Sequence, residues 1–151
     1  MKNNKILICA FVLYLVSLCL PGVTITGING EYTYYGYLIL LFGWLAMTEW
    51  VFAWFANPIF LFVLFRSRVE RAGIMLFASI FSLCLGLMAF TLRTFSNFET
   101  GREEPVQLAI GYYIWLGALA LLVLHSFLRF KPKENSSSEG DRGGYTGVKK
   151  T

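Results

Sequence analysis

The chain has 151 residues, of which 56% are hydrophobic, 17% aromatic and 15% charged. An ordinary soluble domain carries about 25% charged residues, so this composition and a mean hydropathy of +0.59 argue against a water-soluble globular protein. The net charge of +4 comes from basic residues at the ends of apolar runs, whereas a nucleic-acid-binding protein gathers them on one face, so we expect no nucleic-acid partner.

Four apolar stretches follow one another along the chain and predict four transmembrane helices. The expected spans cover about residues 6–23, 38–65, 73–92 and 108–130. A helix needs about 20 apolar residues to cross a bilayer, so the third and fourth fit, the first is short, and the second is long enough to be tilted, kinked or partly interfacial. The runs are too long and too uniformly apolar for barrel strands. We therefore expect an all-α membrane protein, a four-transmembrane-helix bundle within residues 1–130.

The first apolar stretch also has a second interpretation, a cleaved signal peptide. Lys2 and Lys5 would form its basic region and Ile6–Leu20 its apolar region. The cleavage site is poor because Pro21 lies just beyond the small residues Ser17 and Cys19. We favour a retained helix and keep the signal peptide as the alternative.

A small outer β-hairpin is expected at about residues 23–35. Alternation of apolar and polar residues surrounds Asn29-Gly30, a pair that accepts the positive φ angles of a tight hairpin turn. Four tyrosines follow or lie within it, as is typical of the aromatic belt at lipid headgroups. The hairpin is either a recognition surface or a tyrosine-anchored connector.

The second span contains the candidate polar site, Glu49, Asn57 and Pro58. A charged side chain at the bilayer centre costs about 3 kcal/mol, so Glu49 must be neutral, paired or near water. Pro58 frees the carbonyl of Trp54, four residues back, and Asn57 is close enough to supply a donor. Glu49 and Asn57 would share one face of a bent helix, which predicts either a polar pocket or a structural kink.

Helix packing is predicted in the third span, where Ala78, Ser82 and Gly86 repeat at four-residue intervals. Small residues at this spacing let two helices approach closely. The three cysteines lie within apolar runs and are expected to be small buried residues, without a disulfide or metal.

In the second outer loop, Glu103-Glu104-Pro105 is typical of a helix start. In the fourth span, His125 is expected to be an interface residue and not a ligand.

Residues 131–151 are rich in Ser, Gly and charge and predict a disordered tail on the cytoplasmic side. Eleven of the 13 Lys and Arg residues lie at the N terminus, at residues 66–72 or from Arg129 onward. By the positive-inside rule, both termini are expected in the cytoplasm.

The layout resembles that of uncharacterised small bacterial four-helix inner-membrane proteins. The resemblance rests on Leu20-Pro21, Gly43-Trp44 and the run from Trp54 to Pro58, mostly in the first two spans. It implies a location in the bacterial inner membrane and no particular activity.

No zinc-protease helix, Cys-x-x-Cys pair, phosphate-binding loop or nucleophile elbow occurs in the sequence. We therefore expect no enzymatic activity, no catalytic residue, no cofactor and no metal. The favoured function is binding of a membrane-protein partner or a second copy, as an accessory subunit or an envelope immunity or exclusion factor. The alternative is a small transporter or channel component that uses Glu49.

Overall fold

The computed structural model describes residues 2–27, 30–45, 52–66, 72–92, 94–96 and 103–130. The five α-helices described are α1 (Lys2–Cys19), α2 (Gly36–Phe42), α3 (Ala56–Arg66), α4 (Ala72–Leu87) and α5 (Ile110–Arg129). The strands are β1 (Pro21–Gly27), β2 (Gly30–Tyr35), β3 (Thr94–Ser96) and β4 (Glu103–Leu108). The short 3-10 helices η2 (Ala53–Phe55) and η3 (Met88–Thr91) precede α3 and follow α4, and residues 43–45 after α2 are also 3-10 helical.

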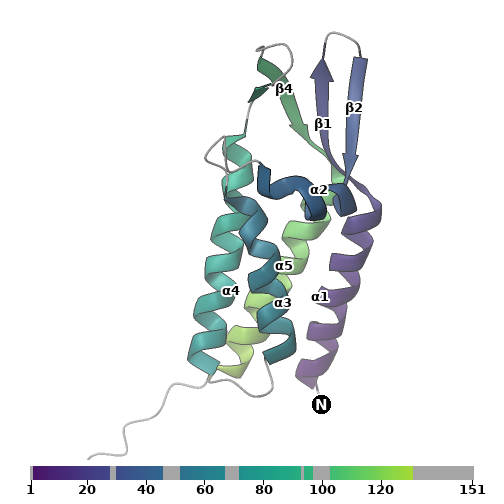
Figure 1. Ribbon diagram of the computed structural model, residues 1–151. Helices are drawn as coiled ribbons and strands as arrows, with labels where there is room; N and C mark the ends of the chain where they lie inside the picture. The colour runs from purple at the N-terminus through teal and green to yellow at the C-terminus, as the bar shows by residue number, and fades with distance from the viewer. Residues whose placement is uncertain are drawn as a thin grey trace, which may run out of the picture.

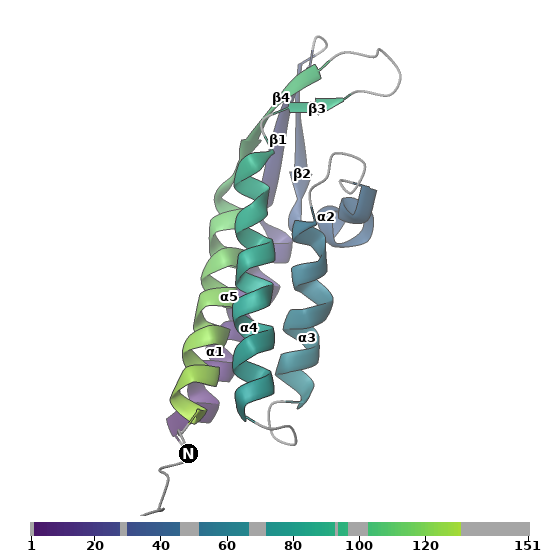
Figure 2. The ribbon, with the colours of Figure 1, turned by 90° about the vertical axis from the view of Figure 1, so that its left-hand side faces the viewer.

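Helices α1, α3, α4 and α5 run side by side, and the strands project beyond one end of them (Figure 1). The short helix α2 lies across the others near this junction and protrudes to one side (Figure 2). The start of α1 and the end of α5 both lie at the end away from the sheet. The molecule therefore has a helical part and a sheet part that follow one another along one axis.

The strands form one antiparallel sheet in the order β2-β1-β4-β3. Strand β4 changes its partner halfway: its first half pairs with β3 through Pro105↔Thr94, and its second half pairs with β1 from Val106↔Ile25. Proline lacks the N–H of a ladder bond and is tolerated where a strand has a free edge. Pro105 lies at this changeover, with β3 as its only paired neighbour among the described strands.

The core lies in the helical part and joins all four long helices. Tyr14 of α1 stacks on Phe60 of α3 with ring centroids 4.6 Å apart. Leu119 and Leu122 of α5 and Met75 of α4 complete the same buried cluster. Small residues in that cluster, such as Ala10 in α1, let the helices approach this closely.

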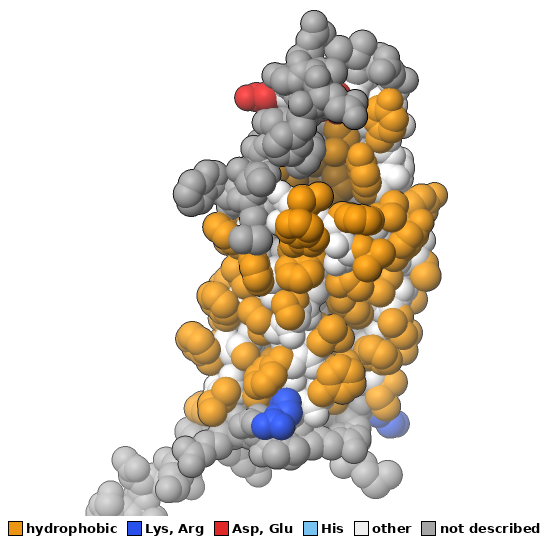
Figure 3. All heavy atoms as spheres, viewed as in Figure 1, with side chains coloured by type: hydrophobic (Ala, Val, Ile, Leu, Met, Phe, Trp, Pro, Cys, Tyr) orange, Lys and Arg blue, Asp and Glu red, His pale blue; other side chains and the backbone are white. Residues whose placement is uncertain are grey.

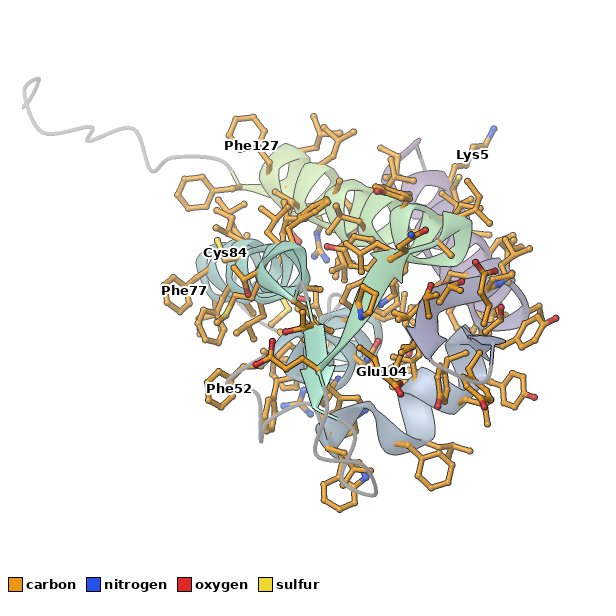
Figure 4. All side chains as sticks on the ribbon, turned by 90° about the horizontal axis from the view of Figure 1, so that it is seen from above. Lys5, Phe52, Phe77, Cys84, Glu104 and Phe127 are labelled. Atoms are coloured by element: carbon orange, nitrogen blue, oxygen red, sulfur yellow. The ribbon has the colours of Figure 1, made fainter. Side chains whose placement is uncertain are left out.

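Large apolar side chains also cover the outside of the helical part (Figure 3). Phe65 and Phe77 are each 74% exposed, and Phe77 and Phe127 point away from the helices when the molecule is viewed from the sheet end (Figure 4). Two helical stretches, Ala72–Thr91 and Ile110–Arg129, are long and apolar enough to cross a membrane, and well under half of each is buried in the protein. A soluble core helix would bury most of its apolar face.

The prediction of an all-α four-transmembrane-helix bundle is wrong. Only two stretches of the described residues reach spanning length, and a four-stranded sheet accompanies the helices. The expected second span, 38–65, is divided into α2, η2 and α3. Helix α3 has 11 residues and is only about 16 Å long, roughly half of a hydrocarbon core. The apolar part of α1, Lys5–Cys19, is also shorter than a full span.

Other expectations outside the helices have mixed outcomes. An antiparallel hairpin is present where it was expected, and Gly30 has the positive φ of +127° that favours glycine. Gly30 pairs with Gly27, so the connection is residues 28–29, which lie outside the described residues together with the tail 131–151. The expected helix start at Glu103 is wrong, because Glu103–Leu108 forms β4.

The three cysteines are free, as expected, but they are exposed. They lie on helix faces that point away from the core, where a thiol behaves as a small apolar group. The expectation that they are buried is therefore wrong.

Candidate functional site

The start of α3 is the place where polar side chains gather in the helical part. Pro58 is the third residue of α3, in the first turn, where backbone N–H groups have no acceptor within the same α-helix and a missing N–H is tolerated. Pro58 was expected to lie inside one long bent helix, and it lies instead at the start of a separate α-helix. The Asn57 side-chain amide donates to the Trp54 carbonyl oxygen at 3.1 Å, which is the hydrogen bond that the sequence suggested.

Asn57 also connects α3 to α5. Its Oδ1 accepts a hydrogen bond from Trp115 Nε1 at 2.9 Å. The side chain is only 7% exposed, so both ends of a buried amide have a partner. A satisfied amide in apolar surroundings fixes one arrangement of its neighbours, since any other leaves a polar atom unpaired.

Two further hydrogen bonds extend this arrangement to α2 and α4. Trp54 Nε1 donates to the Leu40 carbonyl oxygen at 2.8 Å, and Ser82 Oγ donates to the Ala56 carbonyl oxygen at 3.0 Å. We call Trp54, Asn57, Ser82 and Trp115 the Asn57 cluster. Through these four side chains α2, η2, α3, α4 and α5 meet at one level of the molecule.

The other candidate site residue, Glu49, lies outside the described residues. The sequence predicted that Glu49 and Asn57 share one face of a bent helix. Ala53 belongs to η2, and the α-helix begins only at Ala56, so the spacing argument for a shared face does not apply. Of the candidate site residues Glu49, Asn57 and Pro58, the structure therefore places Asn57 and Pro58 at the start of α3.

A cavity of about 120 Å³ adjoins the Asn57 cluster on its sheet side. Its apolar walls include Ile39 and Leu40 of α2, Ala53 of η2, Ala89 of η3 and the nearby Leu92. Trp54 and Trp115 line it together with the backbone of four glycines. It therefore lies where the helical part meets the sheet.

The polar side chains that line the cavity already have hydrogen-bond partners. Ser17 Oγ donates to the Tyr14 carbonyl at 2.6 Å, and Tyr112 hydroxyl donates to the Gly86 carbonyl at 3.0 Å. Asn57 uses both ends of its amide, as described above. A cavity with such walls offers apolar contact and few hydrogen bonds to a ligand.

The small residues of α4 pack as two separate contacts. Ser82 is fully buried and bonds to α3, whereas Gly86 faces α5, where a methyl group on Gly86 would come within 2.8 Å of Leu119 Cδ1. Ala78 is only half-buried. Ser79 takes its place on the buried face, with its hydroxyl 2.8 Å from that of Ser126 in α5.

The residue types that ligate metals are scattered among the described residues. No three of their His, Cys, Asp and Glu side chains are grouped so that they could hold a metal ion. His125 is 2% exposed, and its Nδ1 has no hydrogen-bond partner among the residues that the structure describes, but it lies in the last turns of α5 and does not line the cavity beside the Asn57 cluster. His125 lies beside Ala72 and Met75 of α4.

Sequence reasoning missed Trp54, Trp115 and Tyr112 as members of the site. The available signal was chemical: each is an aromatic residue in an apolar run, and each carries one donor that must find an acceptor when buried. Asn57 was the obvious polar acceptor in that part of the sequence. The sequence does not show that α5, which is distant from Asn57 along the chain, lies beside it in the fold.

Comparison of the chain with known protein families, curated proteins and solved structures finds no match. The function must therefore be argued from the geometry.

Proposed function

We propose that this chain is a non-catalytic protein of the bacterial inner membrane that binds a protein partner through its projecting sheet. The observation that supports this most is the order of basic, apolar and acidic surfaces along the long axis of the molecule. Basic side chains lie at one end, apolar side chains surround the helical part, and acidic side chains lie at the sheet end (Figure 3). A bilayer requires an apolar band with polar surfaces on both sides.

The charges also give an orientation. Lys5, Arg66 and Arg129 lie at the helix ends away from the sheet. The acidic residues that the structure describes are Glu31, Glu103 and Glu104, all in the sheet. By the positive-inside rule, the basic end of the helical part faces the cytoplasm. The start of α1 and the end of α5 therefore lie on the cytoplasmic side, and the sheet lies on the opposite side of the membrane.

Strand β2 is the best candidate for the partner surface. It is an edge strand of the sheet, and all six of its residues are exposed. Tyr32, Tyr34 and Tyr35 are each more than 40% exposed, and tyrosine is enriched among residues that dominate binding energy. Such a surface suits an accessory subunit or an envelope immunity or exclusion factor.

The transport alternative has less support. It depends on Glu49, which lies outside the described residues, and on a polar path beside Asn57. Both ends of the Asn57 amide are occupied by Trp54 and Trp115, and the adjoining cavity has mostly apolar walls.

The proposal is tested by co-purification after mild detergent extraction, with Tyr32→Ala and Tyr34→Ala as variants. If β2 is the partner surface, loss of either ring should weaken binding by about 2 kcal/mol, which is about 30-fold. Tyr113→Ala is the matched control, because Tyr113 is 50% exposed but lies on α5. Recovery of the unmodified protein without any partner in several detergents, or equal losses in all three variants, would contradict the proposal.

A further inference from the structure

We propose that the cavity beside the Asn57 cluster binds one hydrocarbon chain of a membrane lipid. This inference rests on the proposed membrane location and goes beyond partner binding, because it assigns a ligand to the interior of the protein.

The size and the walls of the cavity select an apolar occupant. An apolar protein cavity of about 150 Å³ stays dry and takes up a molecule such as benzene, so about 120 Å³ accommodates a stretch of roughly five or six carbons. A buried water needs two to four free polar partners. The hydroxyls of Ser17 and Tyr112 and the amide of Asn57 are already bonded to protein atoms.

Helix α2 forms the outer wall of this cavity. None of its seven residues is fully buried, although the helix lies across the others. Ile39 and Leu40 face the cavity, whereas Leu41 and Phe42 are 62% and 58% exposed. Helix α2 thus has apolar side chains on its cavity side and on its outer side, and the cavity is not sealed. This arrangement is expected where lipid chains reach both faces of α2.

The position of α2 explains why a lipid chain is the occupant. The indole of Trp54 holds the Leu40 carbonyl, so α2 stays at the level where the helical part ends and the sheet begins. Exposed Tyr35, Tyr37 and Trp44 mark the same level, and aromatic residues of this kind lie at lipid headgroups. A chain from a lipid at that level reaches the cavity from the adjoining apolar surface.

The experiment uses tryptophan quenching by brominated lipid chains. The full chain with Trp44→Phe and Trp50→Phe is placed in phosphatidylcholine vesicles in which part of the lipid carries brominated acyl chains. Trp54 and Trp115, which line the cavity, are then the reporters. Two variants fill the cavity, Ala89→Leu from η3 and Ala53→Leu from η2. Both alanines are 8% exposed. Ala78→Leu is the control, because Ala78 lies on α4 away from the cavity lining.

We expect strong quenching in the parent and in Ala78→Leu, and loss of most of it in a filling variant whose circular dichroism is unchanged. Equal quenching in all variants would overturn the inference. If neither filling variant folds, native mass spectrometry of the parent decides: one retained phosphatidylcholine supports the inference and none overturns it. A separate variant that keeps Trp44 distinguishes the lipid-chain site from the proposed membrane location. If brominated lipid does not quench Trp44, the membrane location itself is refuted.

Discussion

At the scale of single residues, Asn57 is a buried residue that supplies hydrogen-bond partners to neighbours from two other elements. Its amide donates to Trp54 and accepts from Trp115, and the adjacent Ala56 carbonyl accepts from Ser82. A hydrogen bond contributes little net free energy while water can replace it, but an unpaired buried group costs about 1–3 kcal/mol. The stabilising effect of Asn57 is therefore mainly that it leaves no neighbour unsatisfied.

We predict that Asn57→Ala destabilises the protein by about 1–3 kcal/mol, because the Trp115 indole N–H and the Trp54 carbonyl both lose their partner. The measurement is the free energy of unfolding in mild detergent. A red shift of the fluorescence of Trp115 should accompany the loss if water reaches the vacated position.

A double-mutant cycle with Trp115→Phe separates the hydrogen bond from general packing. Phenylalanine has no N–H to leave unpaired, so Asn57→Ala should cost less in the Trp115→Phe background than in the parent. Strictly additive costs would show that the Nε1–Oδ1 bond is not the stabilising contact.

The same residue shows how far the sequence could lead. The bond from Asn57 to Trp54 is local, and Pro58 next to it signalled a carbonyl in need of a donor. The bond to Trp115 crosses 58 residues of chain, and nothing near either residue specifies it. Long-range partners of buried polar groups follow from helix packing, which the sequence alone does not give.

At the scale of elements, the sheet shows the same division between local and distant pairing. The β1–β2 hairpin could be predicted because its turn lies between its strands. Strand β4 could not, since its partner β1 lies about 80 residues earlier and acids before a proline are typical of a helix start. The division of the second span into α2, η2 and α3 was also hidden, because apolar composition is the same in one helix or in several short ones.

Gly111 and Gly117 of α5 test how closely this helix approaches the chain at the start of β1. A methyl group on Gly111 would lie 2.6 Å from the Pro21 carbonyl oxygen and 2.9 Å from that of Leu20, both backbone atoms that cannot rotate away. Gly111→Ala should therefore destabilise the protein by about 1–3 kcal/mol, as overpacking does. The free energy of unfolding in detergent is again the measurement.

Gly117→Ala on the same helix is the control. Apart from the nearby backbone of α5 itself, no atom of the described residues lies within 4 Å of the methyl group that it would add, and alanine is favoured over glycine inside a helix by about 1 kcal/mol. This variant should be neutral or slightly stabilised. If the two substitutions had the same effect, the close approach of α5 to the β1 strand would not be a determinant of stability.

At the scale of the whole molecule, the polar cluster, the cavity and α2 lie between two parts with different surroundings. Below them the exposed side chains are apolar down to the basic residues at the far helix ends, and above them the sheet exposes β2 and carries the described acids. In the proposed membrane orientation, this junction would hold the sheet at a fixed height above the lipid. Two backbone hydrogen bonds of 2.9 Å hold this junction: Gly36 N–H, at the start of α2, donates to the carbonyl of Leu20 between α1 and β1, and Ala109 N–H, just before α5, donates to the carbonyl of Gly22 in β1.

This arrangement predicts which positions a membrane-impermeant maleimide reaches in intact cells. In a background with Cys9, Cys19 and Cys84 replaced by alanine, Thr33→Cys in exposed β2 should react from outside. Phe130→Cys, at the end of α5 and 42% exposed, should react only after the membrane is permeabilised. Cys9 and Cys84 are exposed on the helices, yet if lipid covers them they should resist the reagent in both conditions until the protein is denatured. Equal reaction of Thr33→Cys and Phe130→Cys in intact cells would refute the proposed orientation, and rapid reaction of Cys84 would refute the lipid contact of α4.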